Sequence, residues 1–528
     1  MNNLEIPEEI LCPAGSRRDF PMSVFWAWTI LFVIRAAALF TGIDRLPLVP
    51  AAPPEVIIND PAVALSRGFG LTGFSFEHSL NGLNITYANF PPLYIGLQAL
   101  IFRTLGFSAM TLRSTGAIAD LGACAIFLLA LRELYKRKIL DRFGLAIAGA
   151  VLLLEPVTVM HDRSGRMESL CVLFGSLTFL LCLRADRNPA RQIPLLCAAG
   201  VAAGLAMASH FEALVICAAL ALWTLPRLRR LRFGWIALNA LPLFVVLTVW
   251  MIAYGLKSAE AFRHLRGLAV YAPKSSLNAG EILTALAGRD ARGVLQWAGP
   301  ALFLVLLAVL LGGWRLLSSA IRPAEAAGER SGEWRSALLR LTAIVFVQCA
   351  LIQTIVPGFG STRIVLAVPF AAVCLGTALS YLGPAQRRVT MVGIALLTLS
   401  QLTIITFYLG ELRHSWSERG AQRFDNLVEA IPANARVVGA PELWYAFLSH
   451  NRRMALIYRA DNEEKYWSDE PRAFDPYDVV ILDPGAAGYE ALHAKAREGR
   501  PVEYIFRTYA RNFTVDARSL DMTRLRER

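Results

Sequence analysis

The chain has 528 residues, of which 55% are hydrophobic and only 18% are charged, and its mean hydropathy is +0.45. This composition excludes a water-soluble domain of ordinary surface and indicates a protein whose solvent is mostly lipid. The net charge of +12 does not indicate nucleic-acid binding, because Lys and Arg lie in short clusters between apolar runs and not along one contiguous face.

The first apolar run, residues 21–42, follows Arg17 and Arg18. It is too long for the apolar region of a cleaved signal peptide, so we expect a retained membrane helix with a cytoplasmic N-terminus. Seven of the eight cysteines fall inside apolar runs and only Cys12 lies outside them, so no disulfide framework is indicated.

Residues 44–110 form a predicted first outer loop with two helical stretches. Asn59-Asp60-Pro61 opens a helix expected over residues 62–68. Asp60 is either a simple N-cap, with Pro61 at the first helical position, or a functional carboxylate. Residues 92–105 are apolar but too short to cross a bilayer. We expect an interfacial or re-entrant helix there, which begins after Pro91 and ends at Gly106.

The remaining apolar runs alternate with loops rich in Arg and Lys and bring the expected total to about eleven membrane helices. The later crossings are expected at residues 111–135, 143–160, 169–183, a pair within 193–225, 233–254, 294–317, 338–356, 364–382 and 389–409. A second outer loop covers residues 255–293. The chain is predicted to be a multi-pass protein of the cell membrane, in bacteria the plasma or inner membrane.

After the last crossing the pattern changes to short strand-like and amphipathic stretches. They lie at residues 436–439, 443–449, 454–458 and 477–482. We therefore predict two domains, a membrane domain over residues 1–410 and a small soluble α/β domain over residues 411–528. The odd number of crossings places this second domain outside the cytoplasm.

Ionisable residues gather in the segments expected at the outer face, where unpaired charges beside the bilayer are costly. The turn between the third and fourth crossings carries five of them, His161, Asp162, Arg163, Arg166 and Glu168. The two arginines could hold a phosphate by bidentate contacts, while Asp162 or Glu168 stays ionised beside them. A solvated turn with self-paired charges is the alternative.

Three further ionisable residues are expected at the same face. His210 and Glu212 lie at the turn within residues 193–225. His210 is either a buried residue whose ring nitrogens are hydrogen-bonded within the fold, or a functional residue. Arg363 directly precedes the crossing expected at 364–382. A cation at this position either binds a lipid phosphate or simply extends its charged group to the membrane surface. The sequence contains no nucleotide-binding loop, zinc-ligand spacing or nucleophile elbow. Because nucleotide-activated donors are scarce outside the cytoplasm, where these charged residues are expected, a lipid-linked activated donor is the expected partner.

The order of these features resembles the GT-C superfamily of membrane glycosyltransferases, in particular the family 39-like branch of protein O-mannosyltransferases and the lipid A aminoarabinose transferase. The matching positions are Asp60 in the first outer loop, Pro91-Pro92-Leu93-Tyr94, Glu168, and Arg363 with Pro369 in an Arg-x-x-x-x-x-Pro segment. Relatives often carry Asp-Glu where this chain has Asp60-Pro61, and often Lys where it has His210.

The resemblance implies a GT-C-like α-helical membrane domain that transfers a sugar, with inversion, from a polyprenyl-phosphate donor to a hydroxyl of a glycan, lipid or protein. Asp60 would be the general base and Glu168 a second catalytic carboxylate. The donor phosphate would rest on Arg163, Arg166, His210 and Arg363, with Asp162, Glu212 and Tyr94 near the site.

Two questions stay open at this point. Asp60 and Glu168 could share a divalent cation if the fold brings them together, which linear spacing does not show. A transporter or flippase of a lipid-linked sugar is the alternative function. It is disfavoured because the sequence shows neither paired halves nor Gly- and Pro-broken helices at matching positions.

Overall fold

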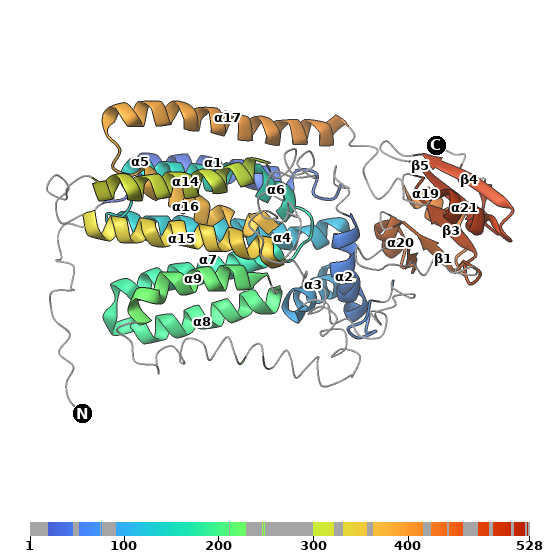
Figure 1. Ribbon diagram of the computed structural model, residues 1–528. Helices are drawn as coiled ribbons and strands as arrows, with labels where there is room; N and C mark the ends of the chain where they lie inside the picture. The colour runs from blue at the N-terminus through green and yellow to red at the C-terminus, as the bar shows by residue number, and fades with distance from the viewer. Residues whose placement is uncertain are drawn as a thin grey trace.

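The protein is a bundle of long helices, with two further helices across one end and a β-sheet beyond them (Figure 1). The computed structural model describes residues 19–45, 52–73, 75, 91–210, 212–228, 245, 248, 299–321, 331–355, 363–414, 424–440, 443–457, 474–484, 489–507, 512–522 and 525. The predicted crossing at 233–254, apart from two single positions, and the predicted second outer loop at 255–293 lie outside the described residues.

The bundle is built from helices that follow the predicted crossings in chain order. They are α1 (Met22–Phe40), α4 (Ala109–Lys136), α5 (Arg142–Leu154), α6 (Pro156–Asp162), α7 (Glu168–Arg187), α8 (Gln192–Ser209), α9 (Ala213–Leu228), α14 (Gly299–Ile321), α15 (Ser331–Ile355), α16 (Val368–Leu379) and α17 (Pro384–His414). The short 3-10 helices η2 (Pro189–Arg191) and η4 (Arg363–Leu366) precede α8 and α16.

Six helical segments among the described residues are long and apolar enough to cross a membrane. They are Met22–Phe40, Ala109–Lys136, Arg142–Asp162, Glu168–Arg187, Gln192–Ser209 and Glu333–Ile352, and four shorter apolar helices accompany them. The chain is therefore a multi-pass membrane protein. The predicted total of about eleven crossings stays a prediction.

Three predicted helices are confirmed and one is corrected. Helix α3 covers Pro92–Leu105 and ends at Gly106, whose φ of 80° suits glycine, while its interfacial or re-entrant placement stays a prediction. Residues 193–225 form the expected pair α8 and α9. The helix expected after Asp60 is wrong in its start, because α2 (Ala52–Ser66) begins eight residues earlier than residue 60 and keeps Pro61 inside it. Asp60 therefore lies in mid-helix and is not an N-cap.

The crossing predicted at 143–160 is two helices, because the chain breaks between α5 and α6. Glu155 is the N-cap of α6, and its buried carboxylate accepts the backbone N–H groups of Val157 and Thr158 at 3.0 and 2.7 Å. Pro156 follows at the first helical position, where its missing N–H costs no intrahelical bond. The short helix α6 carries His161 and Asp162 into the turn before α7.

The two ends of the bundle differ in their charges. At one end, called the basic end below, Arg137 pairs with Asp186 and Arg387 pairs with Asp141, while Tyr381 donates to the carbonyl of Lys138. At the opposite end, called the site end, α2 and α3 cover the turn between α6 and α7 (Figure 1).

The chain after α17 forms a five-stranded mixed sheet in the order β2-β1-β3-β5-β4. The strands are β1 (Val437–Gly439), β2 (Ala455–Leu456), β3 (Val479–Leu482), β4 (Val502–Arg507) and β5 (Asn512–Ala517). β2, β1 and β3 are parallel, and β5 pairs antiparallel with both β3 and β4. Helices α19 (Asp425–Ala430), α20 (Trp444–Ser449) and α21 (Tyr489–Arg497) accompany the sheet. The stretch at 443–449 is thus a helix.

Candidate functional site

The carbonyl of Gly165 is the point where α2, α3 and the turn before α7 meet. Asn59 of α2 donates to it at 2.9 Å, and the hydroxyl of Tyr94 of α3 donates at 2.5 Å. Gly165 has a φ of +60°, and a Cβ there would lie 2.1 Å from the side chain of Leu112. The turn therefore requires glycine both for its backbone conformation and for its close packing.

One helical turn before Asn59, Glu55 forms a buried ion pair with Arg113 at the start of α4. The two side chains make two hydrogen bonds, of 2.8 and 3.1 Å, and Glu55 is fully buried. Arg113 also donates to the carbonyl of Ile43 and lies 5.5 Å from the ring centre of Tyr445 in α20. This pair joins α2, α4, the end of α1 and the C-terminal segment.

Within the turn, Arg166 and Glu168 pair with each other. The guanidinium of Arg166 makes contacts of 2.5 and 3.1 Å to one carboxylate oxygen of Glu168, and the carboxylate is fully buried. Burial by itself would lower the pKa of Arg166, but the carboxylate of Glu168, and then those of Glu212 and Glu55, raise it above its usual value. Arg166 is thus a cation held among three carboxylates, a setting that favours its charged form.

Asp60 lies next to Asn59 but faces the C-terminal segment. Its carboxylate accepts hydrogen bonds from the backbone N–H of Ser75 at 3.0 Å, from the hydroxyl of Ser75 at 2.5 Å and from the indole of Trp444 at 3.0 Å. Burial raises the pKa of the Asp60 carboxyl to about 6, against the lowering effect of these three donors. Successive helical residues differ by about 100° in direction, which explains why Asn59 and Asp60 face different elements.

The other residues of the turn are held by backbone and side-chain partners. Arg163 donates to the carbonyls of Ala38, at 2.9 Å, and Thr41, so it fixes the turn to the end of α1. Asp162 accepts from Ser169 at 2.6 Å and lies 3.0 Å from Nδ1 of His161. The alternative of a solvated turn with self-paired charges is wrong about the solvation, because these side chains are buried, and right about the pairing, because His161 lies against Asp162 and Arg166 pairs with Glu168.

His210 ends α8, and its Nδ1 accepts the backbone N–H of Glu212 at 2.9 Å. Their side chains lie 3.7 Å apart, and the charge of Glu212 acts on Arg166, so this pair belongs to the site end. Arg363 begins η4, and its side chain lies outside what the structure describes.

Four residues of this region were not singled out from the sequence. Besides Glu55 and Arg113, they are Arg35 and Asp120, which form a buried ion pair with two contacts of 2.6 Å between α1 and α4. With Asp162 they line a cavity of about 10 Å³, close to the volume needed for a single water molecule. The signal that would have found Arg35, Arg113 and Asp120 is their charge inside apolar runs.

The predicted sharing of a metal ion by Asp60 and Glu168 finds no support in their contacts. Asp60 faces Ser75 and Trp444, while Glu168 faces Arg166 and lies 3.7 Å from His161. In the part of the chain that the structure describes, no group of three or more His, Cys, Asp and Glu residues could hold a metal ion.

Comparisons with known proteins give similarity of fold and none of sequence. Family models and curated protein sequences give no match to this chain. The structure of ArnT from Cupriavidus metallidurans bound to undecaprenyl phosphate has a TM-score of 0.59 at 14% identity, and the match covers 93% of this chain and 98% of ArnT.

Archaeal proteins give a similar result. For the oligosaccharyltransferase of Archaeoglobus fulgidus in the apo form the TM-score is 0.53 at 13% identity, over 87% of this chain and 70% of that one. For AglB of the same organism, in complex with an inhibitory peptide and a dolichol-phosphate, it is 0.51 at 13% identity, over 93% and 74%. These proteins are GT-C glycosyltransferases, so the predicted GT-C fold is confirmed.

Proposed function

We propose that this protein is a glycosyltransferase that moves a sugar from a polyprenyl-phosphate donor to an acceptor hydroxyl on the non-cytoplasmic side of the membrane. The observation that carries the proposal is the pairing of a fold shared with ArnT, solved with undecaprenyl phosphate, with a buried cluster of carboxylates and guanidinium groups at the site end. Such groups suit a reaction that moves a proton and releases a phosphate.

In the proposed reaction, a carboxylate takes the proton of the acceptor hydroxyl while the acceptor oxygen attacks the anomeric carbon of the sugar. The bond from that carbon to the phosphate oxygen breaks, and the lipid phosphate leaves with the electron pair. The sugar carbon inverts. Cationic donors at the site end stabilise the charge that develops on the departing phosphate.

We assign the base to Asp60. Its pKa of about 6 lies near a physiological working pH, as general-base catalysis favours. Its partners Ser75 and Trp444 are neutral, whereas the nearby carboxylate of Glu55 is paired with the cation Arg113. Because Asp60 is fully buried, the acceptor would reach it by displacing the Ser75 segment.

We assign the binding of the departing phosphate to Arg166, His210 and Arg363. Glu168 then orients the guanidinium of Arg166 through their short ion pair. Arg163 receives a positioning role in place of the predicted phosphate contact, because its guanidinium donates to backbone carbonyls at the end of α1. A requirement for a divalent cation stays a prediction. Comparing turnover in the presence of Mg²⁺ with turnover in the presence of a chelator would check it.

The test uses the full chain in lipid nanodiscs with hexose and pentose donors linked to undecaprenyl phosphate, and measures release of undecaprenyl phosphate together with labelled product. Asp60→Asn should lower turnover by about 10²–10⁴-fold, the usual contribution of a general base, with donor binding retained. The matched control is Asp425→Asn, a carboxylate of the C-terminal segment that contacts His450.

The possible outcomes test the identity of the base and the type of reaction separately. Turnover that survives in Asp60→Asn but fails in Glu55→Gln would move the base to Glu55. A wild-type protein that carries a labelled lipid-linked sugar across a vesicle membrane, without releasing undecaprenyl phosphate, would establish the flippase alternative and overturn the transferase proposal.

A further inference from the structure

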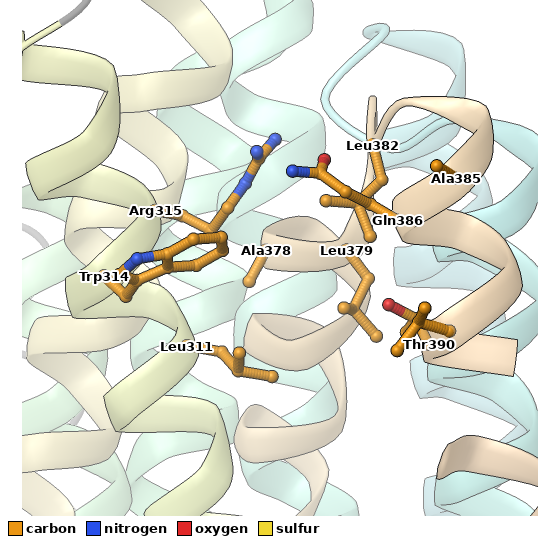
Figure 2. A pocket seen from close by; sticks show the side chains of 10 residues that line it. Leu311, Trp314, Arg315, Ala378, Leu379, Leu382, Ala385, Gln386 and Thr390 are labelled. Atoms are coloured by element: carbon orange, nitrogen blue, oxygen red, sulfur yellow. The ribbon is translucent and has the colours of Figure 1, made fainter. Parts of the chain in front are cut away.

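The basic end of the bundle contains a pocket that the proposed reaction does not use. It lies between α14, the end of α16 and the start of α17, has a volume of about 360 Å³, and is open to the outside (Figure 2). This volume is within the range of small-molecule and lipid pockets. α17 lies along the outside of the bundle (Figure 1). Its side chains Val389, Val392 and Leu399 are each more than 60% exposed.

The pocket has an apolar body and one polar end. Leu311, Ala378 and Leu379 form its inner wall, while the guanidinium of Arg315 and the amide of Gln386 point toward each other at one end (Figure 2). Arg315 is held there by a hydrogen bond to the carbonyl of Ser380 at 3.2 Å and by stacking on Trp334 at 5.2 Å. An apolar trough with a fixed cation at one end matches an acyl chain that carries a phosphate.

The charges around the polar end favour an anionic lipid over a neutral one. Arg387 and Arg388 follow Gln386 directly, and Arg388 is exposed. Arg387 is paired with Asp141, and among the residues that line the pocket Arg315 carries the charge. Clusters of basic residues at a membrane surface attract anionic headgroups.

We propose that this pocket binds one anionic glycerophospholipid, with its phosphate at Arg315 and Gln386 and an acyl chain along Leu311 and Leu379. The bound lipid fills the space between α17 and the rest of the bundle. Because α17 leads directly into the C-terminal segment, the lipid stabilises the helix that connects the two parts of the chain. The proposal concerns the end of the bundle opposite the transferase site and does not depend on it.

The test titrates the full chain, purified and delipidated in detergent, with dioleoylphosphatidylglycerol and, in parallel, with dioleoylphosphatidylcholine, and counts bound lipids by native mass spectrometry. We expect one tight phosphatidylglycerol adduct, with a dissociation constant at least about tenfold below that for phosphatidylcholine, since a charge-assisted contact is worth at least that factor. Arg315→Gln should remove this preference.

Two variants of α17 keep the test independent of any loss of folding. Ala385→Trp places a large side chain at the exposed rim of the pocket and should remove the tight adduct, while Ala395→Trp, exposed on the same helix outside the pocket, should leave it. Binding of undecaprenyl phosphate should be equal in both. Equal affinity of the wild type for the two phospholipids, or a tight adduct that survives in Ala385→Trp, would overturn the proposal.

Discussion

The indole of Trp444 is expected to control the pH at which the proposed transferase becomes active. Trp444→Phe keeps an aromatic ring between α20 and α2 but removes the N–H that donates to Asp60 at 3.0 Å. This donor stabilises the ionised carboxylate, so its loss raises the pKa of Asp60 further above about 6. Since the proposed base acts in its deprotonated form, the acid limb of the pH profile should move to higher pH.

The size of this shift follows from the hydrogen bond that is lost. A hydrogen bond to a charged group is worth about 1.5–3 kcal/mol, and one pKa unit corresponds to about 1.4 kcal/mol. The two hydrogen bonds from Ser75 remain and can tighten, so we expect the lower part of this range, a shift of about one pH unit. At pH 6 the deprotonated fraction then falls from about one half to about one eleventh, so kcat/KM should fall about fivefold there, close to tenfold at pH 5, and change little at pH 9.

The assay is kcat/KM for sugar transfer between pH 5 and pH 9, with release of undecaprenyl phosphate as the readout. The matched control is Trp223→Phe, which removes an indole hydrogen bond of 3.3 Å to Asp186 far from the site end. Its acid limb should stay at about pH 6. A Trp444→Phe profile that falls equally at every pH would mean that Trp444 acts through folding alone, and would refute Asp60 as the group that titrates.

Three further predictions concern stability, two at the site end and one within the bundle, and thermal unfolding in detergent checks each of them. Arg113→Met leaves Glu55 buried without its partner and should cost about 3–5 kcal/mol, whereas Arg387→Met, at a half-exposed pair, should cost about 1 kcal/mol or less. Gly165→Ala, at a φ of +60°, should cost at least about 1–2 kcal/mol and also lower turnover, because the turn it distorts carries the proposed phosphate site. Gly149→Ala, where a Cβ would lie 2.0 Å from an indole nitrogen, should cost about 1–3 kcal/mol by overpacking without a specific loss of turnover per folded molecule.

The helices of the bundle could be predicted because their length and hydrophobicity are local properties of the sequence. The helix at Pro92–Leu105 and the short pair α8 and α9 were found in this way. The start of α2 was not, because Pro61 was interpreted as a first-turn proline, and the packing that holds a proline inside a helix is tertiary.

The site was predicted less completely, because the role of a charged residue depends on its contacts with residues that are distant in the sequence. The turn 161–168 was correctly identified as unusual, yet its burial and the anchoring of Arg163 to α1 depend on contacts more than one hundred residues away. Charged residues inside apolar runs, such as Asp120, carried a usable signal, because a charge in a membrane helix needs a partner.

Helix α2 explains how the C-terminal segment can take part in the proposed reaction. Its Asn59 contacts the turn that holds Arg166, while the next residue, Asp60, is held by Trp444. One helical turn earlier, Glu55 pairs with Arg113, which also lies against Tyr445. The proposed base and the proposed phosphate site are thus linked through a single helix, and the segment after α17 supplies one of the donors that set the pKa of the proposed base. A movement of α20 away from α2 would therefore alter catalysis without displacing any residue of the turn.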